Sequence, residues 1–176
     1  MDTRDRITTT ANRLFYTQGY NNTGINQIIK EAEVAKSSLY QYFPSKEDLL
    51  VEYLESTSLS TNSSLRSIAD KHIQPREKIL AIFDFLLDFS IQTEFQGCNF
   101  QNIAAEIPQE DGRIRALIRN QKNQVRKLFA DILKPIGKEN LADELSVLFD
   151  GAMVASKIFK ELWPIRSTRK MVEKLL

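Results

Sequence analysis

Residues 36–50 of the chain read KSSLYQYFPSKEDLL. Leu39 and Phe43 are four residues apart, so a helix over residues 36–42 places both of them on one apolar face. The opposite face of that helix carries polar or amphipathic side chains: Lys36, Ser37, Tyr40 and Gln41. The segment therefore predicts a short helix that is anchored on one side and exposed on the other.

A second short helix precedes this segment. Isoleucines at helical spacing predict it over residues 25–33, with Thr23 at or just before its N-terminal cap. A tight turn at residues 31–35 joins the two helices in a helix-turn-helix pattern. Beyond them, Pro44 breaks the chain and Ser45 begins a capping box that opens a further helix.

The helix-turn-helix pattern predicts DNA binding, because its exposed side chains can hydrogen-bond to base edges and phosphates in a major groove. Tyr42 and Lys46 suit phosphate contacts, the lysine as a point charge. An alternative interpretation treats Tyr40 and Tyr42 as half-buried aromatics and the lysines as solvated charges. Residues 1–50 hold six basic and six acidic residues, which favours the alternative. Residues 35–45 hold one lysine and no acid, which favours DNA binding.

Apolar residues recur at helical spacing along almost the whole chain, and this pattern predicts an all-α fold of about nine helices. We expect a three-helix DNA-binding domain over residues 1–48 and a larger helical domain over residues 49–176. The Ser/Thr-rich stretch at residues 56–64 is interpreted as the solvent-facing part of a long helix. A loop is expected at residues 94–98, with one helix from about residue 74 to the loop and another from the loop to about residue 106. The remaining helices are expected at about residues 3–18, 112–133 and 141–162, with a last one after Pro164.

The composition excludes several classes of protein. The 176 residues include 24 Lys and Arg and 23 Asp and Glu, a net charge of +1 that excludes a polybasic protein. The longest apolar run, at residues 79–83, is far too short for a membrane span. One cysteine, Cys98, and one histidine, His72, leave too few ligands and bases for most metal sites and acid–base enzymes. We therefore expect a cytoplasmic protein with no metal and no cofactor.

Several segments of the first fifty residues match a known pattern. They are ANRLF (residues 11–15), QGY (18–20), TGI (23–25), IIKEA (28–32), Val34 and LYQYFPSKEDLL (39–50). On these segments, residues 7–50 resemble the DNA-binding domain of TetR-family transcriptional regulators. The resemblance implies base contacts by Lys36, Ser37 and Tyr40. It also implies phosphate contacts by Thr23, Ser38, Tyr42 and Lys46.

Two residues depart from the family pattern. Glu33 stands at the turn position where glycine is usual, and a left-handed residue other than glycine costs about 1 kcal/mol. Ala35 stands where a Ser or Thr cap is common, which is a loss of about 1 kcal/mol. We expect the fold to tolerate both changes, and the angle of the recognition helix to be the property that they affect.

The resemblance also implies that the rest of the chain dimerises and binds a small effector. Small residues in the helix expected at about residues 141–162 let a helix of a second copy approach closely. The alternative is that the same residues pack inside one chain. The predicted homodimer interface comprises Leu145, Leu148, Phe149, Ala152, Met153, Ser156, Met171, Val172 and Leu175. A Phe-rich interior suits a hydrophobic effector. The alternative is that these phenylalanines form an ordinary hydrophobic core. The predicted effector pocket comprises Phe83, Leu86, Phe89, Phe95, Cys98, Phe100, Val125 and Phe129.

Two further features have open interpretations. A basic stripe at Arg115, Arg119, Lys122 and Arg126 is interpreted as a solvated face, with a handle for an anionic effector or an acidic partner as the alternative. Cys98 is interpreted as a buried and inert thiol, with a redox or electrophile sensor as the alternative.

Together with these residues, the resemblance implies a dimeric repressor that binds a palindromic operator, with half-sites about one DNA turn apart, and that a hydrophobic effector releases. The second interpretation is a constitutive DNA-binding or adaptor protein of the same fold, with a filled core and no ligand. An enzyme is not predicted, because Cys98 and His72 have no supporting motif, and no phosphate-binding loop or zinc spacing is present.

Overall fold

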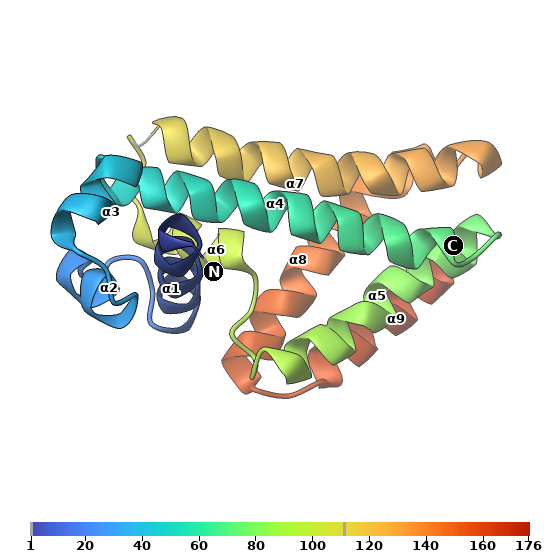
Figure 1. The fold of residues 1–176 in the computed structure, drawn as a ribbon. Helices are drawn as coiled ribbons and strands as arrows, with labels where there is room; N and C mark the ends of the chain where they lie inside the picture. The colour runs from blue at the N-terminus through green and yellow to red at the C-terminus, as the bar shows by residue number, and fades with distance from the viewer. Residues whose placement is uncertain (1, 111) are drawn as a thin grey trace. The chain divides into compact units, whose positions relative to one another are not determined.

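The computed structural model describes residues 2–110 and 112–176, which form helices and loops and contain no strand (Figure 1). Over these residues the nine α-helices are α1 Thr3–Thr17, α2 Ile25–Glu31, α3 Lys36–Tyr42, α4 Lys46–Asp70, α5 Pro75–Gln92, α6 Asn99–Glu106, α7 Gly112–Leu133, α8 Ala142–Phe159 and α9 Trp163–Leu175. Two short 3-10 helices, η1 Lys134–Ile136 and η2 Glu139–Leu141, lie between α7 and α8. The predicted all-α class is confirmed, and the Ser/Thr-rich stretch lies inside α4 as expected.

The helices form two compact units. The first comprises Met1–Ser58 and Asn99–Ile118, and the second comprises Leu59–Cys98 and Arg119–Leu176. Each unit therefore contains one part of α4 and one part of α7. The functional division at residue 48 falls inside α4, and it stays a prediction.

The first unit is built on the apolar face of α1. The buried residues of that helix follow the helical repeat: Ile7, Ala11, Leu14 and Phe15. The ring of Phe15 meets the rings of Tyr20 and Tyr53, with centroids 5.3 and 5.8 Å away. Gly19 follows the C-cap residue Gln18 with φ of 92°, a left-handed conformation that glycine adopts without strain. The chain turns there toward α2.

Three phenylalanine rings fill the centre of the second unit. Phe83 from α5, Phe129 from α7 and Phe149 from α8 have ring centroids between 5.8 and 6.1 Å apart. Phe83 and Phe129 are fully buried. Helices α5, α8 and α9 pack against one another around this centre. Burial of apolar surface, at about 25 cal/mol per Å², is the main stabilising contribution of such a core.

Helix α8 ends earlier than its apolar pattern predicts. It ends at Phe159 rather than at Leu162, because Lys160 adopts a left-handed conformation with φ of 52° that stops the helix. Helix α2 also ends slightly early, at Glu31. The predicted bounds of α3 and α7 agree with the structure.

Two negative findings apply to residues 2–110 and 112–176. No helix there combines the length and the apolar composition that crossing a membrane requires. Within the same residues, no group of three or more His, Cys, Asp or Glu side chains is arranged to hold a metal ion.

Candidate DNA-binding site

Helix α3 presents most of the side chains that the sequence predicts for DNA contact. Leu39 and Phe43 are buried, with 0% and 4% of their surface exposed, and they hold α3 on the first unit. Tyr40 and Tyr42 are 42% and 45% exposed, so they are surface residues rather than the half-buried aromatics of the alternative interpretation. The other predicted contact residues of α3 are Lys36, Ser37 and Gln41, which are exposed, and Ser38, which is half-buried.

The turn before α3 contains Glu33 and Ala35, the two residues that depart from the family pattern. Glu33 has φ of 53°, the left-handed conformation that favours glycine. Its carbonyl oxygen accepts a hydrogen bond from the Arg6 guanidinium at 3.1 Å. Ala35 is the N-cap residue of α3 and offers no side-chain cap. The burial of Leu39 and the bond from Arg6, rather than a cap, therefore hold the recognition helix in place.

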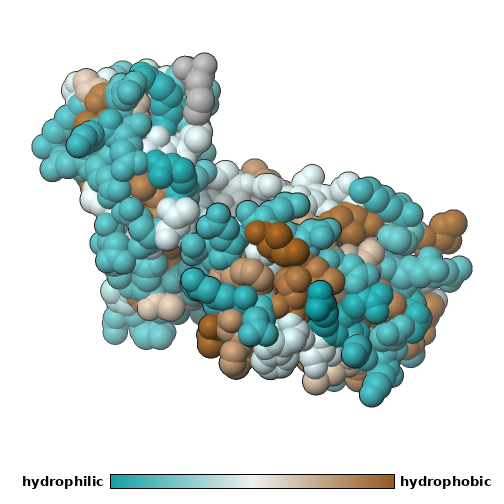
Figure 2. Space-filling model, turned by 90° about the horizontal axis from the view of Figure 1, so that it is seen from below, coloured by the Kyte–Doolittle hydropathy of each residue, from teal (hydrophilic) through white to brown (hydrophobic). Residues whose placement is uncertain are grey.

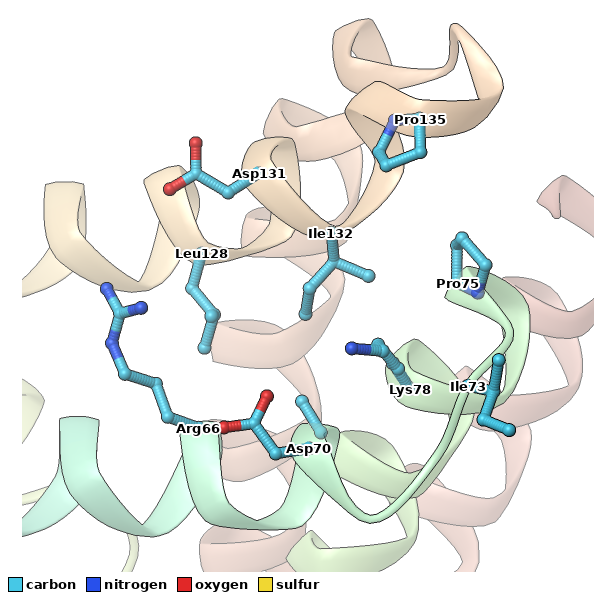
Figure 3. A pocket seen from close by; sticks show the side chains of 10 residues that line it. Arg66, Asp70, Ile73, Pro75, Lys78, Leu128, Asp131, Ile132 and Pro135 are labelled. Carbon is cyan, nitrogen blue, oxygen red and sulfur yellow. The ribbon is translucent and has the colours of Figure 1, made fainter.

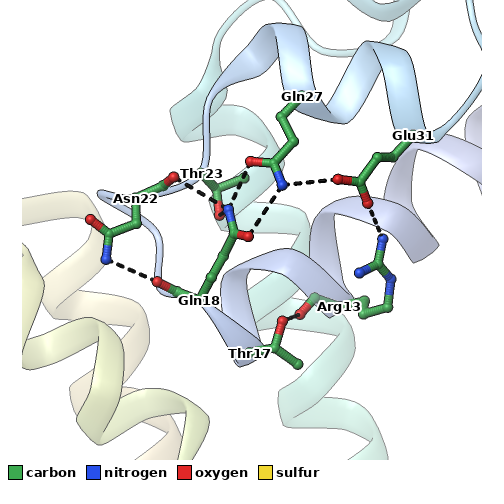
Figure 4. Close-up of polar contacts among 7 residues, drawn as sticks. All are labelled: Arg13, Thr17, Gln18, Asn22, Thr23, Gln27 and Glu31. Carbon is green, nitrogen blue, oxygen red and sulfur yellow. Dashed lines mark hydrogen bonds and ion pairs between the residues drawn. The ribbon is translucent and has the colours of Figure 1, made fainter.

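A chain of polar groups holds α2 against the end of α1 (Figure 4). The amide of Gln18 donates to Gln27 at 2.8 Å, and the amide of Gln27 donates to Gln18 at 3.2 Å and to Glu31 at 2.9 Å. Arg13 completes the chain by pairing with Glu31. The hydrogen bond from Gln27 and the pairing with Arg13 lower the pKa of the Glu31 carboxyl group. The sequence does not predict this network, because none of these residue types by itself indicates which partner it bonds to.

Thr23 lies inside that network and not on the surface. Its side chain is fully buried, and its hydroxyl donates to the Gly19 carbonyl at 2.7 Å and accepts from Gln18 at 3.1 Å. It precedes Gly24, which is the N-cap residue of α2 and makes no side-chain cap. Because a fully buried side chain cannot touch a phosphate, Thr23 is removed from the predicted set of DNA contacts.

Lys46, in the first turn of α4, has partners within its own unit. Its ammonium lies 4.2 Å from the centre of the Tyr20 ring, a cation–π contact. Burial lowers the pKa of Lys46, and the carboxylate of Glu106 opposes that shift. Glu106, at the end of α6, accepts from the backbone N–H of Asn21 at 2.7 Å, and its carbonyl accepts from the Asn21 side chain at 2.9 Å. No local pattern in the sequence indicates this role of Glu106, because Glu106 and Asn21 are 85 positions apart.

Known proteins share this helix-turn-helix. Residues 7–53 match the family described as bacterial regulatory proteins, tetR family. The chain is 31% identical to the HTH-type transcriptional regulator LmrA of Bacillus subtilis over 170 residues, which are 95% of this chain and 90% of LmrA. The chain belongs to the TetR family. The predicted TetR resemblance is thus confirmed, and the relatives are transcriptional regulators rather than enzymes.

Further TetR-family proteins are similar over almost the whole chain. The HTH-type transcriptional repressor NemR of Escherichia coli strain K12 is 26% identical, over 99% of this chain and 94% of NemR. The crystal structure of E. coli NemR in its reduced form has a TM-score of 0.87, over 99% of this chain and 97% of that one. A TetR-family regulator from Streptomyces coelicolor has a TM-score of 0.92 at 25% identity, over 98% of this chain and 87% of that one. The protein is a DNA-binding transcriptional regulator with the TetR fold.

The residues predicted to line a TetR-family effector pocket fall into three groups. Four are buried in the core of the second unit: Phe83, Leu86, Val125 and Phe129. Phe100 is buried in the first unit. The remaining three are half-buried: Phe89, Phe95 and Cys98. Phe83 and Phe129 pack with Phe149 ring against ring at the centre of the second unit, and the effector pocket stays a prediction.

The predicted dimer interface is partly wrong. Six of its residues are buried inside the second unit: Leu145, Phe149, Ala152, Met153, Ser156 and Val172. Three reach the surface: Leu148, Met171 and Leu175. The exposed apolar residues of α8 are others: Val147, Val154, Ile158 and Phe159. The error has a physical reason, since α8 is apolar on two faces and periodicity alone does not say which face packs inside the chain.

The basic stripe on α7 is mostly occupied by groups of the chain itself. Lys122 pairs with Asp150 at 2.7 Å and lies 3.4 Å from the sulfur of Cys98. Burial disfavours the charged ammonium, but Cys98 and Asp150 outweigh this effect and raise the pKa of Lys122. Arg115 and Arg126 also bond to carbonyl or carboxylate oxygens of their own units. The interpretation as a solvated face is therefore wrong for Lys122.

Proposed function

We propose that the protein is a transcriptional repressor that binds a palindromic operator as a homodimer and that a small hydrophobic effector releases from DNA. The exposed face of α3 carries the proposal, because its donors and acceptors match those of base edges in a major groove. We assign base contacts to Lys36, Ser37, Tyr40 and Gln41. We assign phosphate contacts to Ser38, Tyr42 and Lys46. NemR, a relative over almost the whole chain, is named a repressor, which supports the same role here.

The homodimer part of the proposal rests on exposed apolar surface in the second unit. Hydrophobic residues gather among polar ones on one face of the molecule (Figure 2). A groove of about 710 Å³ lies between α8 and α9, lined by Val147, Leu148, Met171 and Leu175, with Asp143, Glu144 and Lys174 around them. An exposed apolar surface of this kind is typical of an interface. A second copy that covers it brings a second recognition helix, which a palindrome with half-sites about 34 Å apart requires.

The effector part rests on the Phe-rich centre of the second unit. A hydrophobic ligand that enters there has to displace rings, because Phe83, Phe129 and Phe149 contact one another. Such a ligand releases DNA only if it binds more tightly to the form that does not bind DNA. The same ring packing favours the second candidate function, a constitutive DNA-binding protein with a filled core.

Selection of bound sequences from random duplex DNA, with the purified protein, tests the proposal. We expect a palindrome with half-sites about one helical turn apart. Tyr40→Ala, run in parallel, is expected to lose about tenfold or more in affinity for that palindrome, since one good base contact is worth about 1–3 kcal/mol. No enrichment, or equal affinity of the Tyr40→Ala protein, contradicts the assignment of α3. Release of the operator by planar aromatic compounds then separates the effector-controlled repressor from the constitutive protein.

A further inference from the structure

A cavity of about 310 Å³ lies in the second unit, where α4 and α7 end and α5 begins (Figure 3). This volume is at the lower end of the range of small-molecule sites, about 300–1,000 Å³. Leu128 and Ile132 of α7 and Pro135 of η1 give one wall of the cavity an apolar surface, and Asp131 of α7 lies beside them. Ala69 and Pro75 add apolar surface from α4 and α5. The cavity therefore suits a small ligand with an apolar part.

Charges of opposite sign face the same cavity. Lys78 of α5 points its ammonium into it, and the carboxylate of Asp70, at the end of α4, turns toward it as well (Figure 3). Within residues 2–110 and 112–176, Lys78 and Asp70 have no ion pair with each other or with any other group. Asp131, the other carboxylate of the lining, already pairs with Lys127 at 3.0 Å. The lining therefore offers a ligand the Lys78 ammonium and the Asp70 carboxylate, with the Arg66 guanidinium as a second cation.

The helix ends add to this separation of charge. Helix α5 begins at Pro75 after an N-cap residue, Gln74, that makes no side-chain cap, so its partial positive end lies beside Lys78. Helix α4 ends at Asp70, which places its partial negative end beside that carboxylate. The cavity thus has one side that favours an anion and one side that favours a cation.

We propose that this cavity binds a free amino acid with an apolar side chain. The ligand carboxylate bonds to Lys78, and the ligand ammonium bonds to Asp70. The apolar side chain packs on Leu128 and Ile132. Ile73, in the loop between α4 and α5, lines the cavity and is 87% exposed, so the ligand also covers apolar surface that is now in water. This site does not depend on DNA binding.

The charges distinguish a zwitterion from simpler ligands. A monoanion of the same shape leaves Asp70 without a partner, and a monocation leaves Lys78 without one. A polar group that loses water and gains no hydrogen bond opposes binding. A ligand with both charges on one carbon is the smallest molecule that satisfies both residues.

Titration calorimetry of the full chain tests the proposal with L-leucine and L-phenylalanine as probes. The matched controls are isocaproate, which is leucine without its ammonium, isoamylamine, which is leucine without its carboxylate, and glycine, which has no apolar side chain. We expect each control to bind about tenfold or more weakly than L-leucine. Isocaproate and isoamylamine each lose a hydrogen bond to a charged group, worth about 1.5–3 kcal/mol. Glycine loses the burial of an apolar side chain, which is worth about 1.5–3 kcal/mol. No heat from either amino acid at millimolar concentration, or equal binding of isocaproate, overturns the proposal.

Variants locate the site. Lys78→Met and Asp70→Asn are each expected to lower the affinity for L-leucine about tenfold. Lys71→Met is the matched control, because Lys71 is an exposed neighbour that does not line the cavity. Both test residues retain some solvent exposure, so the melting temperatures of the variants check that the fold persists. Unchanged affinity in both Lys78→Met and Asp70→Asn places any binding elsewhere and overturns the proposal.

Discussion

The ammonium of Lys46 lies over the ring of Tyr20, 4.2 Å from its centre, and this contact ties the start of α4 to the loop after α1. Glu106 bonds to Asn21 of the same loop. A phosphate that contacts Lys46 therefore meets an ammonium that is already oriented, so little rotamer freedom is lost on binding. The Glu106 carboxylate nearby is a competing anion for that ammonium.

Replacement of Lys46 by alanine is expected to weaken binding to all duplexes alike. The lysine contributes a phosphate contact and no base contact, so the slope of log K against log salt should flatten by about one unit. Fluorescence anisotropy over a salt series, with the selected operator and a scrambled duplex, measures both effects. Lys71→Ala, an exposed lysine of the second unit, is the matched control. An unchanged salt slope in the Lys46→Ala protein contradicts the phosphate contact.

Replacement of Glu33 by glycine is expected to stabilise the protein. Glu33 has φ of 53°, a conformation that costs a residue with a Cβ atom about 1–2 kcal/mol. Glycine avoids this cost, but it also raises the entropy of the unfolded chain, which cancels part of the gain in stability. We expect the free energy of unfolding in denaturant to rise by about 0.5–1 kcal/mol. Glu55→Gly, at an exposed position inside α4, should lower it by about 1 kcal/mol. A loss of stability in the Glu33→Gly protein would show that the turn is not strained.

A charge on the exposed apolar face of α8 is expected to break the homodimer. Ile158 lies about three helical turns after Val147 of the groove, on the same exposed face of α8. Ile158→Asp should therefore bury an unpaired carboxylate in the interface and raise the dimer dissociation constant at least about tenfold. Sedimentation velocity at several concentrations measures the dissociation constant. Ile91→Asp, at an exposed apolar position on α5, is the control and should leave the dimer intact. If the Ile158→Asp protein is as dimeric as the wild type, the interface lies elsewhere.

The ion pair of Lys122 with Asp150 is expected to contribute to stability. Their side chains are 27% and 33% exposed, so Asp150→Ala should cost about 1 kcal/mol, less than a fully buried pair. Asp131→Ala removes a pair in which Lys127 is 71% exposed, and it should cost close to nothing. Equal costs in the two variants, measured by denaturant unfolding, would contradict the role of burial.

The same pair predicts a pH dependence. The pKa of Lys122 is raised above its ordinary value of 10.5, so the folded state holds the proton more tightly than the unfolded state. This contribution to the unfolding free energy is complete below pH 10.5 and is lost as the pH rises through the pKa of the folded state. Asp150→Ala should reduce that alkaline loss, which thermal melting across the range detects. An identical alkaline profile in the variant would mean that Cys98, and not Asp150, raises the pKa of Lys122.

The helices and the recognition surface follow from signals between residues a few positions apart. Ser45 accepts from the backbone N–H of Asp48 at 3.1 Å, as the capping box predicts, and α4 begins beside it. The spacing of Leu39 and Phe43 turns Tyr40 outward, because a helix fixes which residues share a face. Local sequence is sufficient for such features, since covalent geometry and the helical repeat set them.

Contacts between distant segments depend on packing that no local pattern contains. Glu106 of α6 reaches Asn21, in the loop after α1, across 85 residues. Helix α8 has apolar residues on two faces, and only the position of Phe83 and Phe129 selects the face that is buried. Periodicity in the sequence is the same for an apolar face that packs inside the chain and for one that stays exposed. The hydrophobic effect is non-directional, so only the packing of other elements decides which face is buried.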